Sequence, residues 1–239
     1  MPVRQAILGC LNFIFRQRGM ELRPVLPERR DSGMQAGLRR LSRWLGPVET
    51  VIDVGAAAGN WTRGGLAHFP SARFLMVEPL RERTAELKAL CAEVGRAELV
   101  SAVAGRSRGE ARFRVAPDLD GSGVATGPGE TGRTVPVTTL DEEAAERGLK
   151  GPYFIKLDTH GFEVPILEGA IKILGETAGL VIEAYNFRLT PECLRFHELC
   201  AWMNERGFRV ADLLDPLRRP ADEVLWQMDL VFLRKEHSL

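Results

Sequence analysis

The chain has 239 residues, which suits one α/β domain with a sizeable core and is short for two. Lys plus Arg and Asp plus Glu each number 32, so the formal net charge is zero and the composition lacks the basic surplus of a nucleic-acid-binding protein. The four cysteines form no CxxC pair, which fits reduced thiols. We therefore expect a cytoplasmic globular protein with no nucleic-acid partner.

The first part of the chain is expected to form an N-terminal helical extension over residues 1–46, before a main domain over residues 47–239. An apolar run near its start is flanked by arginines, but it is far shorter than the ~20 residues that span a bilayer. Two interpretations stay open for residues 1–20: a helix packed on the domain or on a second copy in a homodimer, or an amphipathic segment in peripheral contact with a membrane. Residues 34–45 are predicted to form an amphipathic helix.

Short apolar runs then alternate with helical patterns. Strands are expected over residues 50–55, 72–78, 97–103, 153–158, 179–183, 208–214 and 229–233, and helices over 61–68, 80–94, 165–174 and 191–206. Strands separated by helices imply a parallel sheet with right-handed crossovers. The last two strands have no helix between them, so we expect them to be antiparallel. The pattern predicts a Rossmann-like α/β sheet that is mostly parallel with an antiparallel last strand.

A glycine-rich stretch over residues 105–137 interrupts this alternation. Two β-like pieces, Ala111 to Val115 and Thr134 to Val137, predict a β-hairpin insertion with a mobile glycine-rich tip. A structureless loop of this length is unusual in a compact domain unless it serves the site. The other interpretation of the tip around Ser122 is a plain solvent loop.

The turn after the first strand is the strongest local signal. Gly55 and Gly59 let the backbone approach a ligand where a side chain would block it. Their GxxxG spacing fits neither the GxGxxG dinucleotide pattern nor a P-loop. Glu78 comes at the carboxyl end of the next strand, where a carboxylate can accept hydrogen bonds from ribose hydroxyls. Together these features predict a site for an adenosine-type cofactor.

Several motifs resemble those of the FkbM-family methyltransferases. The matching segments are the turn Asp53 to Thr62, the pair Glu78-Pro79, Ala102 to Glu110, Val135 to Asp141, the Lys-x-Asp-x-x-Gly-x-Glu segment within Ile155 to Ala170, and the ending Gln227 to Phe232. The resemblance covers roughly residues 50–233. It implies the class I methyltransferase version of the sheet and S-adenosyl-L-methionine (SAM) as cofactor. It further implies O-methylation of a hydroxyl on a sugar, glycolipid or polyketide-type acceptor.

Two positions depart from the family pattern, and both lie where the acceptor is expected. His160 stands where most members have an acidic or amide residue, and Glu183 to Phe187 is more polar than a usual end to the fifth strand. These departures bear on the acceptor and leave the cofactor expectation intact. The expected cofactor-binding residues are Asp53, Gly55, Ala56, Gly59, Asn60, Trp61, Glu78, Ser122 and Asp158.

The expected catalytic residues follow from the chemistry of methyl transfer. This reaction is an in-line displacement, so the protein mostly has to position the reactants, and a hydroxyl nucleophile must also lose its proton. Asp158, His160 and Glu183 are candidates because the carboxyl ends of neighbouring parallel strands meet in one cleft. Lys156 is the fourth candidate, although it could instead be a structural ion-pair partner, for example of Glu163.

Two mechanisms stay open. Either His160 or Asp158 is the general base, or Asp158 and Glu183, with Asn186 or His160, hold a divalent metal ion that lowers the pKa of the acceptor hydroxyl. We favour the base because the family resemblance carries no metal. Two other functions also remain, a nucleotide-binding module without catalysis and an NAD-dependent oxidoreductase.

Overall fold

The computed structural model describes residues 32–127 and 131–236. The expectations for residues 1–20, and part of the glycine-rich tip, lie outside these ranges. The compact unit that carries the sheet begins at Ser32. The elements are α2 (Met34–Leu45), β1 (Thr50–Val54), α3 (Asn60–His68), β2 (Arg73–Val77), α4 (Thr84–Val94), β3 (Ala97–Val100), β4 (Val103–Ala104), β5 (Gly109–Arg114), β6 (Gly123–Val124), β7 (Arg133–Thr138), α5 (Leu140–Glu146), β8 (Tyr153–Leu157), α6 (Glu163–Glu168), α7 (Ile171–Gly175), β9 (Thr177–Tyr185), α8 (Phe196–Glu205), β10 (Phe208–Arg218) and β11 (Leu225–Arg234).

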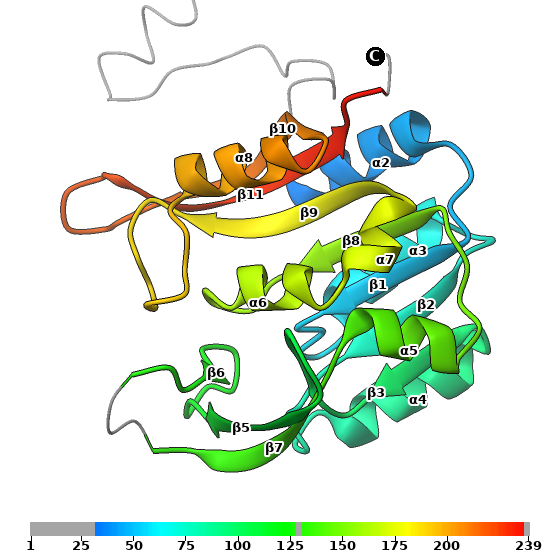
Figure 1. Cartoon of the computed structure of the whole chain (residues 1–239), viewed down its shortest axis with the longest axis horizontal. Coiled ribbons are helices and arrows are strands. Elements are labelled where there is room, and N and C mark those ends of the chain that lie inside the picture. The colour runs from blue at the N-terminus through cyan, green and yellow to red at the C-terminus, as the bar shows by residue number, and fades with distance from the viewer. Residues whose placement is uncertain (1–31, 128–130, 237–239) are drawn as a thin grey trace, which may run out of the picture. The chain divides into compact units, whose positions relative to one another are not determined.

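Within the described ranges, the main sheet has seven strands in the order β10-β11-β9-β8-β1-β2-β3 (Figure 1). Strands β3, β2, β1, β8 and β9 pair in parallel, and β11 runs antiparallel to both β9 and β10. The central strands β1 and β8 are buried along their whole length, as expected for parallel strands covered on both faces. The predicted mostly parallel sheet with an antiparallel last strand is therefore confirmed.

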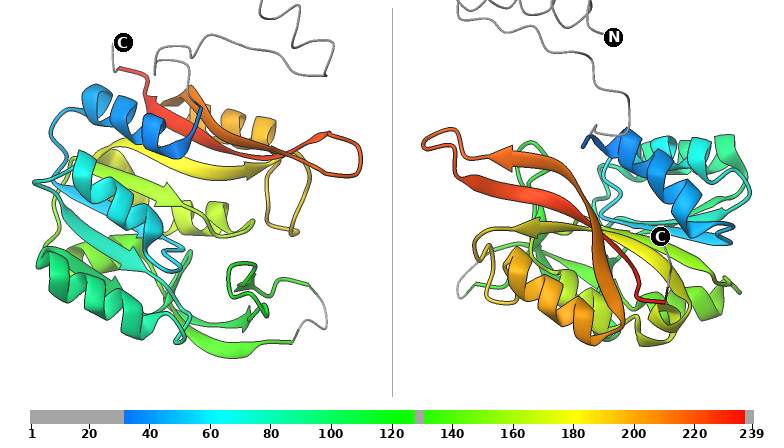
Figure 2. Two further views of the ribbon diagram at one scale, coloured as in Figure 1. Left: turned by 180° about the vertical axis from the view of Figure 1, so that it is seen from behind. Right: turned by 90° about the horizontal axis from the view of Figure 1, so that it is seen from above.

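Helices cover both faces of this sheet. The core on one face includes apolar side chains of α2, α3 and α4, and the core on the other includes those of α5, α6, α7 and α8. Figure 2 shows α2 and α8 on opposite sides of the sheet. Leu38 and Leu41 of α2 are fully buried, so this helix packs on the sheet. The division of the chain at residue 46 stays a prediction. In the described part of the chain, no helix has the length and apolar character needed to cross a membrane.

The insertion forms a second, four-stranded sheet in the order β4-β7-β5-β6 among the described residues. Strands β5 and β7 pair antiparallel, which agrees with the predicted hairpin. The strand predicted over residues 97–103 was too long, because β3 ends at Val100 and the chain then enters the second sheet as β4. The helix predicted over residues 165–174 is divided into α6 and α7 around Gly169. A Cβ on Gly169 would lie 2.0 Å from the carbonyl oxygen of Gly105, so this position between the two helices requires glycine.

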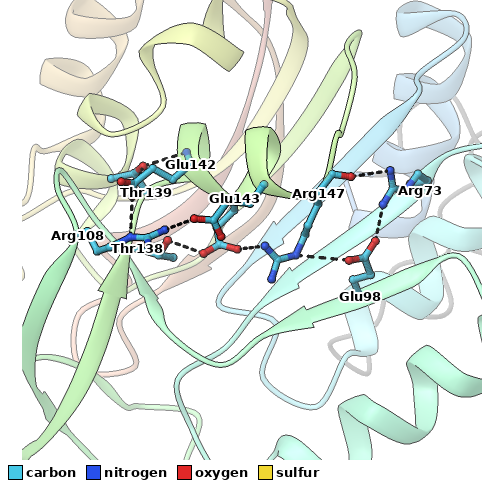
Figure 3. Close-up of polar contacts among 9 residues, drawn as sticks. Arg73, Glu98, Arg108, Thr138, Thr139, Glu142, Glu143 and Arg147 are labelled. Atoms are coloured by element: carbon cyan, nitrogen blue, oxygen red, sulfur yellow. Dashed lines mark hydrogen bonds and ion pairs between the residues drawn. The ribbon is translucent and has the colours of Figure 1, made fainter.

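Helix α5 was not predicted, and polar contacts hold it in place (Figure 3). Its N-terminus is capped by the Thr139 hydroxyl, which accepts a hydrogen bond from the backbone N–H of Glu142 at 3.1 Å. The buried Glu143 accepts a hydrogen bond from the Thr138 hydroxyl and forms an ion pair with Arg147. Arg147 also contacts Glu98 of β3, which ties the helix to the edge of the main sheet. Helix α5 thus anchors the return of the chain from the insertion to β8.

Candidate functional site

A cavity of about 530 Å³ lies at the carboxyl ends of the parallel strands. This is the position at which ligands bind to open α/β sheets, and the volume suits a small ligand. The insertion contributes Phe113 of β5 and Val124 of β6 to the opposite wall. The predicted site residues that line the cavity are Gly55, Ala56, Asn60, Trp61, Glu78, Ser122, Lys156, Asp158, His160 and Glu183.

The turn at Gly55 is held between the two neighbouring strands. The N–H of Gly55 donates to the carbonyl of Val77, and the N–H of Asp158 donates to the carbonyl of Val54. Gly55 has φ +77°, and a Cβ built on it would lie 2.0 Å from the carbonyl oxygen of Asp158. Glycine is therefore required at this position by both conformation and space. Gly59 also has a left-handed backbone, with φ +76°, and a Cβ there would lie 2.9 Å from Leu90 of α4; its contact with a cofactor stays a prediction.

Glu78 presents its carboxylate to the cavity directly after β2. One carboxylate oxygen accepts a hydrogen bond from the N–H of Ala57 and the other from that of Leu80, both at 2.8 Å. Burial raises the pKa of Glu78 above its ordinary value, although these two hydrogen bonds oppose the rise. Each oxygen keeps a further lone pair for a ligand hydroxyl. The carboxylate is thus fixed by backbone and able to accept hydrogen bonds from a ribose.

Asp53 does not line the cavity, unlike most of the predicted cofactor residues. It is fully buried, and one of its carboxylate oxygens accepts a hydrogen bond from the Thr62 hydroxyl at 2.6 Å. The other has no hydrogen-bond partner among the described residues and lies 3.5 Å from the ammonium nitrogen of Lys156. Asp53 therefore ties α3 to β1 and faces Lys156, and its contact with a cofactor stays a prediction.

Lys156 is buried between two carboxylates. Its ammonium nitrogen lies 3.1 Å from Asp158 and 3.5 Å from Asp53. Burial opposes the charge on Lys156, but the attraction of Asp158 and then of Asp53 outweighs it and raises the pKa of the ammonium group. The suggested pairing of Lys156 with Glu163 is not found. The Glu163 carboxylate instead accepts hydrogen bonds from the N–H of Gly161 at 2.9 Å and the Thr159 hydroxyl at 3.1 Å, which closes the loop after β8.

Glu183 at the end of β9 differs sharply from Asp158 in its ionisation. Burial, followed by the negative charge of Asp158, raises the pKa of Glu183 to about 9. Burial also disfavours the charged form of Asp158, but Lys156 outweighs it and holds the pKa of Asp158 below its ordinary value. At neutral pH the pair therefore consists of an ionised Asp158 and a protonated Glu183.

Three residues around Glu183 were missed by the sequence analysis. Tyr185 donates its phenolic O–H to Glu183, and the Gln227 side-chain amide donates to the other carboxylate oxygen at 3.0 Å. Asp229 lies directly opposite Glu183 on β11, and burial, then the charge of Asp158, raises its pKa to about 7. A signal for them existed, because Gln227 and Asp229 belong to the matched C-terminal motif and Tyr185 shares a strand face with Glu183.

His160 follows Asp158 in the loop after β8 and faces the same cavity. Its backbone is left-handed, with φ +54°, which is uncommon for a residue with a side chain. The ring Nδ1 lies 3.0 Å from the carbonyl oxygen of Ser122, and Nε2 lies 3.9 Å from Asp158 and 4.0 Å from Glu183. A carbonyl can only accept, so a hydrogen bond here requires a proton on Nδ1, and a neutral ring of this form would keep its lone pair on Nε2. The predicted convergence of Asp158, His160 and Glu183 is thus present.

The same three side chains are also the group in the described ranges that could hold a metal ion. One ligand atom from each of Asp158, His160 and Glu183 lies within 4.8 Å of the other two. The ammonium group of Lys156 already forms an ion pair with Asp158 at 3.1 Å, so a metal ion would compete with it for that carboxylate. Binding of a metal ion would also require Glu183 to lose its proton, and the pKa of Glu183 is about 9. The arrangement suits proton transfer better than metal binding.

Comparison with known proteins shows the family to which this chain belongs. The model of the methyltransferase FkbM domain matches residues 53–210. No curated protein sequence matches the chain. Among solved structures, 1,6-didemethyltoxoflavin-N1-methyltransferase of Burkholderia thailandensis, with 1,6-didemethyltoxoflavin and S-adenosylhomocysteine bound, is 16% identical with a TM-score of 0.46 over 85% of this chain and 80% of that chain. N-methyltransferase NodS of Bradyrhizobium japonicum is 12% identical with a TM-score of 0.47 over 84% of this chain and 94% of that chain. An rRNA methylase of Streptococcus thermophilus is 14% identical with a TM-score of 0.46 over 83% of this chain and 93% of that chain.

Proposed function

Because the chain belongs to the FkbM methyltransferase family, we propose that it is a cytoplasmic, SAM-dependent O-methyltransferase. The acceptor is a hydroxyl group of a small molecule or glycan, of the sugar, glycolipid or polyketide type, and not a nucleic acid. The observation that carries the proposal is the position of the His160 ring. It faces the same cavity as the Gly55 turn and Glu78, so a proton acceptor and a nucleoside-binding carboxylate share one space.

The residues on the cofactor side fit SAM. Glu78 offers carboxylate lone pairs to ribose hydroxyls, and the backbone turn at Gly55 brings the main chain to the cavity without a side chain in the way. Asn60 and Trp61 lie at the start of α3 and line the same cavity. When bound, SAM supplies a methyl group on a positively charged sulfur, which is electrophilic. The ionised Asp158 favours a positive charge in this cavity.

On the acceptor side, the chain has to place a hydroxyl and take its proton. Bound SAM would supply the methyl carbon to the acceptor oxygen, and the electron pair of the broken carbon–sulfur bond would stay on the sulfur of S-adenosylhomocysteine. His160 Nε2 accepts the hydroxyl proton as the oxygen attacks. Asp158 and Glu183 lie about 4 Å from this nitrogen, so the negative Asp158 stabilises the imidazolium that forms. Lys156 holds Asp158 in place.

We predict that His160→Ala lowers the rate of methyl transfer by roughly 10²–10⁴-fold, the usual contribution of a general base. The affinity for SAM should change little, because His160 acts on the acceptor. The measurement is transfer of an isotope-labelled methyl group from SAM to a panel of hydroxylated sugars, glycolipids and polyketides. His197→Ala, at an exposed position of α8, is the matched control and should keep the wild-type rate. Equal activity of the two variants would rule out His160 as the base.

The metal mechanism is the alternative, and the cluster of Asp158, His160 and Glu183 keeps it open. It predicts that a chelator abolishes transfer and that Mg²⁺ or Mn²⁺ restores it. Under the base mechanism, chelation leaves the rate unchanged. An oxidoreductase would instead bind NAD and transfer no label. A nucleotide-binding module would bind SAM with no transfer to any acceptor.

A further inference from the structure

A short turn of the insertion, residues 116–122, lies between β5 and β6 and is closed by its own hydrogen bonds. The N–H of Leu119 donates to the carbonyl of Ala116 at 3.0 Å, and the N–H of Ser122 donates to the carbonyl of Leu119 at 3.2 Å. The hydroxyl of Ser122 accepts from the buried N–H of Ala116 at 3.0 Å, so it joins the two ends of the turn. Ser122 is itself buried. The position of its backbone carbonyl is therefore fixed by its own side chain.

This fixed carbonyl is the group that accepts the hydrogen bond from Nδ1 of His160, at 3.0 Å. Two arrangements compete for this ring. If Nδ1 carries the proton, it donates to Ser122 and Nε2 is free to accept a proton from a substrate. If Nε2 carries the proton, the ionised carboxylate of Asp158, 3.9 Å away, attracts it, and Nε2 cannot act as a base toward the acceptor. The partner of one ring nitrogen decides the state of the other.

The turn is anchored on the cofactor side of the cavity. The carboxylate of Asp120, within the turn, forms an ion pair with Arg83 at 2.7 Å. Arg83 follows Glu78 by five positions in the segment between β2 and α4. The neighbouring Glu82 accepts two hydrogen bonds from the guanidinium of Arg133, at 2.8 and 2.7 Å, which holds the start of β7 beside the same segment. The turn thus spans from the segment that carries the ribose-binding carboxylate to the ring of His160.

We propose that Ser122 is a positioning residue for His160: its hydroxyl closes the 116–122 turn, and its carbonyl holds the imidazole in the form with a proton on Nδ1 and a free Nε2 toward the acceptor. The proposal rests on the proposed function, in which His160 is the base. It gives the insertion a part in the chemistry, since the tautomer of His160 is set by a group that the insertion supplies.

The test is ¹⁵N NMR of the histidine rings in the full chain, because ring nitrogen shifts report which nitrogen carries the proton. The His160 signals are assigned by their loss in His160→Gln. In the wild type we expect the proton on Nδ1. In Ser122→Ala the Ala116 N–H loses its acceptor, the turn loosens, and we expect the ring to shift toward the form protonated on Nε2. Ser122→Thr keeps the hydroxyl and should restore the wild-type spectrum. Ser107→Ala, at an exposed serine of the same insertion, is the control and should leave it unchanged.

The same variants are assayed for methyl transfer. For Ser122→Ala we expect kcat to fall about 10- to 100-fold, within the contribution of a general base, and to change more than the KM for SAM. A wild-type His160 ring protonated on Nε2, or a Ser122→Ala spectrum identical to the wild type, would overturn the proposal. Because the ring spectrum needs no turnover, it decides the positioning role even if the transfer assay fails. An expected spectrum without any methyl transfer would count against the proposed function alone.

Discussion

At the scale of single residues, Gly55 shows how conformation and space act together. Its φ of +77° is costly for any residue with a Cβ, and that Cβ would also lie 2.0 Å from the Asp158 carbonyl. Gly95, at the end of α4, has a similar φ of +71°, but a Cβ added there would meet no atom within 4 Å beyond its chain neighbours. A side chain at Gly95 would therefore cause backbone strain alone, whereas one at Gly55 would cause both strain and steric overlap.

We predict that Gly95→Ala lowers the free energy of unfolding by about 1–2 kcal/mol, the cost of a left-handed residue. Gly55→Ala should lower it by more, roughly 3 kcal/mol or above, because overlap with backbone adds to the strain. Urea denaturation of the wild type and both variants gives the comparison. Equal losses for the two variants would show that the turn can shift to accommodate a methyl group, contrary to this account.

The raised pKa of Glu183 predicts a pH dependence of stability. Its folded pKa is about 9 against an ordinary value of 4.5, so the folded chain holds this proton more tightly than the unfolded chain. The resulting stabilisation is fully present below the unfolded pKa of 4.5 and is lost as the pH rises through about 9.

Glu183→Gln cannot lose a proton, so its melting temperature should fall less than that of the wild type between pH values of about 5 and 9. Glu205→Gln, at an exposed position of α8, is the control and should follow the wild type. Thermal melts across this pH range provide the measurement. Parallel curves for Glu183→Gln and the wild type would mean that Glu183 is ionised in the folded protein.

At the scale of elements, the insertion is expected to respond to ligands. It lines the cavity through the 116–122 turn, and a segment that closes over a site excludes water from it. We predict that SAM together with an acceptor slows amide hydrogen exchange over residues 116–127. The tip of the β10–β11 hairpin, residues 219–224, does not line the cavity and should exchange at an unchanged rate. An exchange rate over residues 116–127 that is the same with and without both ligands would show that the insertion does not close over the cavity.

The order of the elements could be predicted where apolar periodicity was strong, as in β1 and β8. Helix α5 was missed although Thr139 and Glu142 form a Thr-x-x-Glu capping pattern, because the helix is short and the contact of Arg147 with Glu98 joins distant parts of the chain. The close approach of Gly169 to the backbone of Gly105, at the division between α6 and α7, is also a contact between distant parts of the chain. Local pattern carries no information on either contact.

Some features of the site could likewise be predicted from the sequence, and others could not. The meeting of Asp158, His160 and Glu183 followed from topology, since neighbouring parallel strands end on one side of a sheet. The role of Gln227 depends on the pairing of β11 with β9, and the contact of His160 with Ser122 uses a backbone carbonyl. A carbonyl is present at every residue, so the sequence holds no signal for that contact.

For the whole molecule, the arrangement places one cavity between two sheets. The carboxyl ends of the main sheet supply the polar groups, and strands of the insertion supply part of the apolar wall. A charge or hydrogen bond acts more strongly in such a partly enclosed space than in water. The turn at Gly55 and the carboxylate of Glu78 lie together in this cavity, and the proposed function needs them to bind the nucleoside part of SAM.

The most direct measurement is therefore calorimetric binding of S-adenosylhomocysteine to the wild type and to Glu78→Ala. We expect wild-type binding in the micromolar range and a loss of roughly 1–3 kcal/mol in the variant, because hydrogen bonds to a charged acceptor are left unmade. Glu205→Gln should bind like the wild type. Absence of S-adenosylhomocysteine binding to the wild type, together with tight binding of NAD, would contradict the account.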